Sequence, residues 1–282
     1  MNGALPQRIA GRAVVGARRV GGGSINAAFR VELEGGGAAF VKTRPDAAPG
    51  EYAAEAAGLA WLADGGARVP EVLEAADGWL ALAWLDEGRL DARGEEELGR
   101  MLARMHLADA EAFGARPGAG GGGGELRIGA VVLPAATGDA WPRFYAEHRL
   151  LPLHADAGLT RAGARAVEEV CARIDALAGP PEPPARLHGD LWAGNVLATR
   201  EGAPVLIDPA AYGGHREVDL AMLALFGAPA QSTLDAYDEL HPRAEGHEER
   251  VALWQLFPLL VHAVLFGGSY AQAVERAARR YV

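Results

Sequence analysis

The chain of 282 residues contains a single cysteine, Cys171. It therefore cannot form an intrachain disulfide, and nothing in its cysteine content calls for an oxidising compartment. The chain also lacks an excess of basic residues, since 27 Lys and Arg stand against 37 Asp and Glu, a formal net charge of −10. A general binder of nucleic acid or of an anionic membrane needs a basic face, so we expect neither partner.

A signal peptide and a membrane-spanning helix are both unexpected. Arg8 and Arg12 interrupt the N-terminal region, where a signal peptide would have a continuous apolar segment. The apolar run 251–266 is too short to span a bilayer and contains Pro258 and His262. We interpret it as a buried helix and expect a cytoplasmic protein. Hydrophobic residues make up 50% of the chain, enough for one large domain or two lobes.

The most informative stretch is 187–208, which reads LHGDLWAGNVLATREGAPVLID. Asp190 and Asn195 are five positions apart, the spacing of the H-R-D-x-x-x-x-N loop of kinases, and Asp208 ends a short apolar strand, like the second metal-binding Asp of a kinase. Mg²⁺ prefers oxygen ligands. The pattern therefore predicts phosphoryl transfer, with Asp190 as proton acceptor and Asn195 and Asp208 as magnesium ligands. Turn formation after a strand could explain any one of these residues, but not all three at this spacing.

The first part of the chain predicts a small sheet and one helix. The expected strands are 12–20, 28–33, 38–42, 69–73 and 79–85, and the expected helix is 50–63. On that helix Tyr52, Glu55, Leu59 and Leu62 share one face, so Glu55 lies within an apolar stripe. A buried carboxylate needs a cation, and Lys42 at the end of the third strand is the predicted partner. The alternative is a carboxylate at the edge of the stripe that reaches water.

Glycines lie between the first two strands. Gly22, Gly23 and Ser24 follow the first strand, where glycine lets backbone N–H groups approach phosphate oxygens. This segment matches neither a P-loop nor G-x-G-x-x-G, so a plain hairpin turn is an equal alternative. Its position upstream of Lys42 favours a phosphate-binding role.

The end of the fifth strand is the predicted hinge between two lobes. Backbone groups of Ala83 and Leu85, on either side of Trp84, could read an adenine edge, and Asp86 could meet a polar ligand. This assignment depends on order along the chain alone. The domains are therefore expected to be residues 1–85 and 86–282.

The rest of the chain is expected to be mainly helical. The predicted helices are 95–113, 141–153, 160–177, 218–226, 232–240 and 248–281, the last with a break near Gly267 and Gly268. Residues 115–124 form a loop of small residues that ends in five glycines. Only eleven positions separate Asp208 from Asp219. That distance leaves no room for a long activation loop, so we expect activity without a phosphorylation switch.

Three residues near the predicted catalytic Asp have less certain roles. His188 is expected to fix the loop through ring hydrogen bonds, and it is a weaker candidate for contacting substrate. Trp192 could stack on the apolar face of a sugar or anchor the loop in the core, and the sequence does not separate these. Asp219 could cap a helix or bond the backbone of the catalytic loop.

Several stretches together resemble the fructosamine (ketosamine) kinase family of the protein-kinase-like superfamily. The stretches are 22–26, 40–42, 141–150, the catalytic loop with Trp192, and 212–222 with its H-R-E-x-D-L-A-M sequence. The resemblance implies an α+β, bilobal, protein-kinase-like fold, with a β-rich N-terminal lobe and a larger helical lobe. It implies ATP and Mg²⁺ as cofactors, and as substrate a ketosamine, small or protein-bound. Phosphorylation of a sugar hydroxyl would make that adduct labile and reverse glycation.

Two departures from the family pattern concern the ligand sites. Ala83 stands where the hinge usually has an acidic residue, and the glycines at 120–124 replace a more structured segment. An aminoglycoside-type or choline-type acceptor is therefore the alternative substrate. A catalytically inactive nucleotide-binding protein is less expected, because the lysine and the three catalytic-loop and metal residues are all present. No obligate protein partner is predicted.

Overall fold

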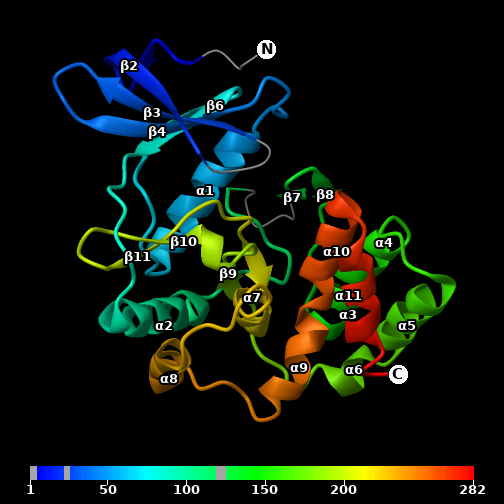
Figure 1. Cartoon of the computed structure of the whole chain (residues 1–282). Coiled ribbons are helices and arrows are strands. Elements are labelled where there is room, and N and C mark those ends of the chain that lie inside the picture. The colour runs from blue at the N-terminus through cyan, green and yellow to red at the C-terminus, as the bar shows by residue number, and fades with distance from the viewer. Residues whose placement is uncertain (1–4, 22–25, 119–124) are drawn as a thin grey trace.

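The computed structural model describes residues 5–21, 26–118 and 125–282. The predicted phosphate-loop residues Gly22, Gly23 and Ser24, and residues 119–124 of the glycine-rich loop, lie outside these ranges. A β-sheet with one helix against it stands above a larger, mainly helical part (Figure 1). This arrangement confirms the predicted α+β, bilobal class. The division at residue 85 stays a prediction.

The N-terminal lobe is built on a six-stranded sheet in the order β1-β2-β3-β4-β6-β5. Every neighbouring pair in it is antiparallel. Its strands are β1 (Arg8–Ile9), β2 (Arg12–Val20), β3 (Ala27–Leu33), β4 (Ala38–Thr43), β5 (Val72–Ala76) and β6 (Trp79–Ala83). The fourth predicted strand, 69–73, was placed about three residues early, because the chain reaches the sheet only after Pro70.

Strand β4 has two different faces, as period-two alternation requires. Ala39 and Val41 are fully buried against one set of apolar side chains. Phe40 and Lys42 lie on the other face, toward helix α1 (Glu51–Asp64). The helix packs on this face through Tyr52 and Leu59, so Glu55 is carried toward Lys42.

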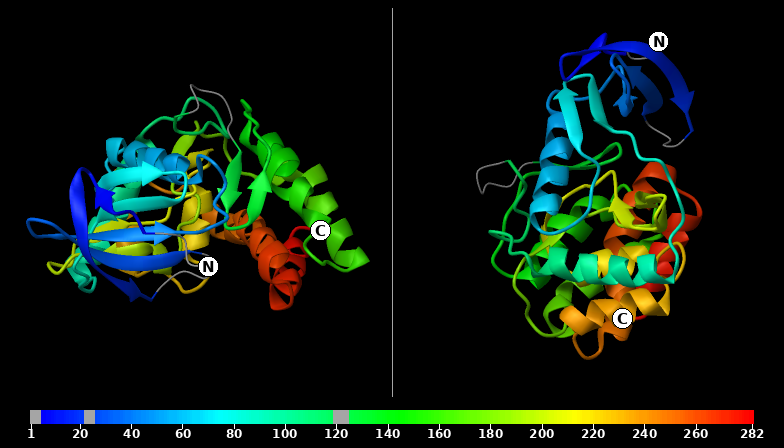
Figure 2. Two further views of the ribbon diagram at one scale, coloured as in Figure 1. Left: turned by 90° about the horizontal axis from the view of Figure 1, so that it is seen from above. Right: turned by 90° about the vertical axis from the view of Figure 1, so that its left-hand side faces the viewer.

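The C-terminal lobe is a group of helices with short strands at its upper side (Figures 1 and 2), and these strands form three two-stranded ladders among the described residues. The helices are α2 (Ala92–Leu107), α3 (Trp141–Tyr145), α4 (Leu151–His154), α5 (Arg161–Ala172), α6 (Ile174–Leu177), α7 (Glu217–Leu223), α8 (Gln231–Leu240), α9 (His247–Trp254), α10 (Leu256–Phe266) and α11 (Ser269–Ala278). A π-helical turn, η1 (Ala146–Leu150), joins α3 to α4, and η2 (Ala193–Asn195) is a 3₁₀ turn. The short strands are β7 (Leu126–Ile128), β8 (Val131–Leu133), β9 (Ala185–Leu187), β10 (Val196–Ala198), β11 (Pro204–Leu206) and β12 (Tyr212–Gly214).

Helix α2 differs from its prediction at both ends. Asp91 caps its start, accepting a hydrogen bond from the Gly94 amide at 2.8 Å, so the helix begins three residues before the predicted position. It ends at Leu107, where Ala108 turns to extended backbone. The predicted helix over 95–113 was therefore too long, and the segment up to Phe113 instead runs beside the catalytic strands.

The last predicted helix is divided into three. The break at the glycine pair is confirmed, because Gly267 and Gly268 both have positive φ, which favours glycine. A further interruption falls at Gln255, between α9 and α10. The stretch His247–Phe266 is long and apolar enough to cross a membrane, but 61% of its most apolar window is buried inside the protein. This matches the interpretation of 251–266 as a core helix.

Candidate active site

Two short β-ladders position the predicted catalytic residues. Strand β9 pairs with β12, and β10 pairs with β11, both antiparallel. The catalytic loop connects β9 to β10 and carries Asp190, while Asp208 lies between β11 and β12. Gly189 lies so close to the Ala210 carbonyl that any side chain there would overlap it. The two loops are therefore held directly against each other.

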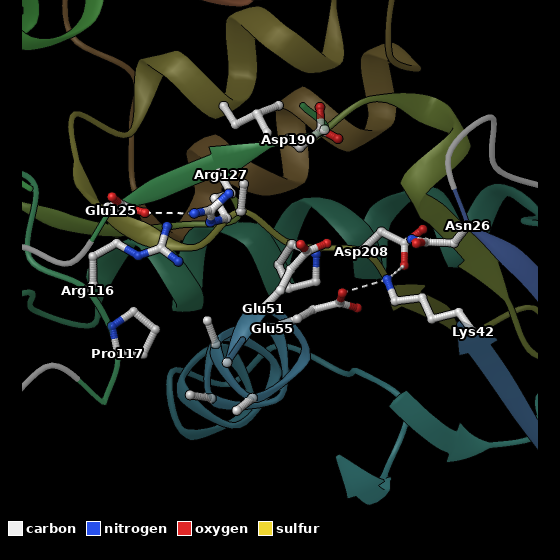
Figure 3. Close-up of a pocket in the computed structure, with 18 of the residues that line it drawn as sticks. Asn26, Lys42, Glu51, Glu55, Arg116, Pro117, Glu125, Arg127, Asp190 and Asp208 are labelled. Atoms are coloured by element: carbon white, nitrogen blue, oxygen red, sulfur yellow. Dashed lines mark hydrogen bonds and ion pairs between the residues drawn. The ribbon is translucent and has the colours of Figure 1, made fainter. Parts of the chain in front are cut away.

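These loops and the N-terminal lobe enclose one cavity of about 640 Å³. Lys42 reaches it from the sheet and Glu55 from α1, while Asp190 and Asp208 reach it from the larger lobe (Figure 3). Asn195 also lines it. The structure thus brings together five side chains that the sequence places up to 166 positions apart.

The predicted ion pair between Lys42 and Glu55 is present, with 2.5 Å between Lys42 Nζ and a carboxylate oxygen. Lys42 also contacts Asp208 at 2.9 Å. Burial by itself would lower the pKa of Lys42, but the charges of Glu55 and Asp208 and their hydrogen bonds outweigh burial and raise it. The lysine is consequently a fixed cation at this end of the cavity.

Asp190 and Asn195 are coupled within the catalytic loop. The Asn195 side-chain amide donates to the Asp190 backbone carbonyl at 2.8 Å and to its carboxylate at 3.2 Å. Its own carbonyl oxygen is thereby oriented away from Asp190, available as a ligand atom. Burial raises the pKa of Asp190, opposed by the charges of His188 and His262. A raised pKa makes this carboxylate a stronger base than a solvated one.

Asp208 has a strained backbone, with a φ of 53° in the region that non-glycine residues rarely occupy. One carboxylate oxygen binds Lys42, and the side chain is otherwise 47% exposed toward the cavity. Together with the amide oxygen of Asn195, it gives the all-oxygen donor set that suits Mg²⁺. The residues present therefore fit the predicted metal.

His188, a weaker candidate for contacting substrate, does not line the cavity. Its side chain is fully buried, the Nε2–H donates to the Ile207 carbonyl at 2.9 Å, and Nδ1 accepts from the Asp190 amide at 3.3 Å. The expected loop-fixing role is confirmed. Asp219 also holds the catalytic loop, because its two carboxylate oxygens accept hydrogen bonds from the backbone amides of His188 at 2.7 Å and Gly189 at 2.9 Å.

Trp192 lies on the cavity wall with 39% of its surface exposed, so it does not anchor the loop in the core. Its ring meets Phe226 edge-on at 5.9 Å between centroids. Phe226 in turn contacts His262 and Tyr270, at 5.2 and 6.4 Å between centroids. These four rings form an aromatic patch beside the catalytic loop.

The predicted hinge residues lie outside this cavity. The Ala83 amide donates to the Glu71 carbonyl at 2.8 Å, and the Trp84 amide donates to the Ala38 carbonyl at 3.3 Å. Adenine recognition by Ala83 and Leu85 stays a prediction.

Asp86, also a candidate for a substrate contact, does not line the cavity that Asp190 lines. Its carboxylate accepts from the Trp84 indole at 3.1 Å and meets Arg200 at 3.5 Å. A contact between Asp86 and substrate stays a prediction.

Sequence reasoning missed six polar residues that line the cavity. Asn26 accepts from the buried Tyr52 hydroxyl at 3.1 Å. Arg44 is bound to Glu51 at 2.7 Å, and Arg127 to Glu125 at 2.8 Å. Arg116, the sixth, belongs to no recognisable motif, and its position beside a glycine-rich loop gave no signal.

Known proteins resemble the chain over most of its length. A Thermus thermophilus protein named "Probable ketoamine kinase" is 38% identical over 259 residues, which cover 91% of this chain and 90% of that protein. A chloroplastic protein-ribulosamine 3-kinase of Arabidopsis thaliana is 33% identical over 269 residues, covering 89% and 78%. The crystal structure of a candidate fructosamine-3-kinase from Thermobifida fusca is 46% identical, covers 96% of this chain and 95% of its own, and superimposes with a TM-score of 0.88.

More distant structures share the fold alone. Macrolide and aminoglycoside phosphotransferases superimpose with TM-scores of 0.62–0.64 at 16–21% identity, which confirms the protein-kinase-like fold. The sequence pattern that describes fructosamine kinases matches residues 6–282, almost the whole chain. This protein therefore belongs to the fructosamine kinase family.

Proposed function

We propose that this protein is an ATP-dependent kinase that transfers a phosphoryl group to a sugar hydroxyl of a ketosamine. One observation carries the proposal: Lys42, Asp190, Asn195 and Asp208 line a single cavity, with Lys42 in direct contact with Asp208. Phosphoryl transfer depends on positioning and charge stabilisation, which such a set supplies. Membership of the fructosamine kinase family and the ketoamine kinase named above support the acceptor class.

Each side chain has a defined role in this reaction. Lys42, held by Glu55, binds the nucleotide phosphates, and the cavity confines donor and acceptor in one orientation. Asp190 accepts a hydrogen bond from the attacking hydroxyl and takes its proton as the new oxygen–phosphorus bond forms and the bond from the γ-phosphorus to the leaving ADP breaks. Asn195 and Asp208 would hold Mg²⁺, which neutralises charge on the phosphate oxygens when bound. The buried Asp219 positions the loop through two backbone amides and does not touch the reactants.

The aromatic patch of Trp192, Phe226, His262 and Tyr270 supports a sugar acceptor. The exposed face of Trp192 lies on the same loop as Asp190, two positions further on. Aromatic faces pack well against the apolar C–H face of a sugar, and they attract the protonated amine of a ketosamine. We place the sugar between this patch and Asp190.

The test is ADP release with a panel of acceptors at fixed ATP and Mg²⁺. Ketosamines of fructose and ribulose should be phosphorylated, and kanamycin and choline should be at least tenfold poorer by kcat/KM. The D190N variant, tested in parallel, should be inactive with every acceptor. Turnover of kanamycin or choline in preference to all ketosamines would refute the proposed acceptor class. A wild-type protein that no ATP and Mg²⁺ mixture stabilises against heat would refute the kinase itself.

A further inference from the structure

Arg116 is an unusual cation in the wall of the cavity. It is half-buried, it lines the same space as Asp190, and its Nη1 atom is buried without a hydrogen-bond partner in the described part of the chain. None of the residues outside the described ranges has an acidic side chain, so they cannot supply a carboxylate either. Burial, together with the nearby charge of Arg149, lowers the pKa of Arg116 to about 10. It is nevertheless protonated at neutral pH.

A second guanidinium lies behind it. Arg149 is 2% exposed, and its Nε atom also has no partner among the described residues. It packs against the rings of Phe144 and Tyr212, each 4.6 Å from the guanidinium carbon. The Tyr212 hydroxyl is buried beside this guanidinium. Two cations and a phenol thus adjoin one another, and among the described residues no carboxylate pairs with either cation.

The other cations of the cavity wall differ from Arg116. Lys42 binds Glu55 and Asp208, Arg44 binds Glu51, and Arg127 binds Glu125. A buried cation with open donor positions is costly unless an anion occupies them during function. The guanidinium fork is suited to two-point binding of a carboxylate or phosphate.

The position of Arg116 indicates which ligand it meets. Figure 3 shows Arg116 and Arg127 at the opposite side of the cavity from Lys42 and Asp208. The nucleotide phosphates belong to the Lys42 end. The acceptor, whose hydroxyl must reach Asp190, is the ligand that can extend toward Arg116.

We propose that Arg116 forms an anion-binding subsite for the acceptor, so that the preferred ketosamine carries a carboxylate or a phosphate. A carboxylate would come from a ketosamine of a free amino acid, and a phosphate from a ketosamine of a sugar phosphate. This inference rests on the proposed function. It narrows the substrate to anionic small molecules in preference to neutral adducts.

The experiment compares three matched acceptors: fructosyl-glycine, fructosyl-glycinamide, and fructosyl-glycinamide 6-phosphate. Fructosyl-glycinamide is called the neutral acceptor because it has no anionic group. Dissociation constants are measured by calorimetry with ADP and Mg²⁺ present, and kcat and KM are measured at saturating ATP. The variants are R116Q and R116K, with R143Q as control, because the Arg143 side chain is 78% exposed and, in the part of the chain that the structure describes, forms an ion pair only with Glu147. Thermal unfolding of each variant tests its folding.

The wild type should bind at least one anionic acceptor about ten to a hundred times more tightly than the neutral one. R116Q should abolish that preference and leave the KM for ATP and the affinity for the neutral acceptor unchanged. R116K should retain part of it, since the charge stays and the fork is lost. R143Q should behave as the wild type. The acceptor that loses affinity in R116Q identifies carboxylate or phosphate as the bound group.

Three results would overturn the subsite: no preference in the wild type, an equal loss for neutral and anionic acceptors, or a raised KM for ATP in R116Q. Failure of the proposed function looks different, because no acceptor would then be phosphorylated by the wild type. Acceptor binding that depends on Arg116, without any turnover, would support the subsite and refute the proposed function. Turnover without a preference for anionic acceptors would support the proposed function and refute the subsite.

Discussion

Buried arginines occur in two places in this molecule, and only one of the two contains carboxylates. Behind the catalytic loop, Arg216 makes two bonds of 2.8 Å to Glu182, and Arg250 makes bonds of 2.9 and 2.7 Å to Glu217. Arg116 at the cavity, and Arg149 behind it, have no carboxylate partner among the described residues. Arg216 and Arg250, which support the fold, are paired within the chain. Arg116, in contrast, keeps an open donor position for a ligand.

Asp219 of helix α7 and Asp190 of the catalytic loop differ in the same way. Asp219 is 1% exposed and accepts hydrogen bonds from two loop amides and from His106 at 3.3 Å. Asp190 faces the cavity, and within the described ranges its carboxylate accepts a hydrogen bond only from the Asn195 side-chain amide. We therefore expect substitutions behind the loop to affect stability, and substitutions at the cavity to affect turnover.

The largest expected effect is that of Asp190→Asn. The variant keeps the size of the side chain but cannot accept the proton, so kcat should fall at least about a thousandfold. ATP binding, measured by calorimetry, should stay within about threefold. The matched control is Asp219→Asn, which should lower the thermal midpoint instead. A D190N variant that unfolds several degrees lower, or keeps a tenth of its activity, would contradict this division.

Next in size is Glu217→Gln, which leaves the Arg250 charge without a carboxylate. We expect a loss of about 2–3 kcal/mol in the free energy of unfolding by urea. The loss is at the low end for a broken buried pair, because Arg250 keeps the Glu245 carbonyl at 2.9 Å. The kcat at 25 °C should be unchanged, since Glu217 does not line the cavity. The R116Q variant should lose less than about 1 kcal/mol, and equal losses would mean that both arginines serve the fold.

The same division explains what the sequence could predict. The spacing of Asp190, Asn195 and Asp208 indicated the chemistry because loop length constrains which side chains reach one metal. Lys42 and Glu55 were predictable from strand and helix periodicity. Arg116 was not, because its environment depends on Arg149 and Tyr212, which are far away in sequence and meet it only through packing.

Errors in the predicted elements have a similar origin. The helix over 95–113 was extended by its composition of good helix formers, but Asp109 and Phe113 pair with β-bridge partners elsewhere in the chain. The short strands β9 to β12 have three residues each, too few to show a period. His188 was a weak candidate for substrate contact only because burial cannot be read from a motif.

The pH dependence of turnover tests the environment of Asp190, the aspartate that faces the cavity. Burial raises the pKa of Asp190, and the charge of Asp208 adds to this, whereas His188, His262 and the Asn195 amide oppose it. The ionised form is the active base, so kcat/KM should fall about tenfold per pH unit as pH drops below that raised pKa. The acid limb of the profile of kcat/KM against pH, recorded at saturating ATP and Mg²⁺, should therefore lie at higher pH than it would for a solvated Asp. An acid limb at the pH expected of a solvated Asp would mean that the cavity does not desolvate this carboxylate.

The smallest effect concerns Gly194, whose added methyl group would overlap the Trp192 ring. Gly194→Ala should displace the ring from the place where the sugar is proposed to pack, and raise the KM for a ketosamine about threefold to tenfold, the size of one aromatic contact. The KM for ATP should not change, because Lys42 and Asp208 are untouched. Gly78→Ala is the control, since a Cβ there meets nothing within 4 Å. If G194A changes kcat but not the acceptor KM, the glycine serves the geometry of Asn195 and Asp190 instead, and Trp192 is not part of the acceptor site.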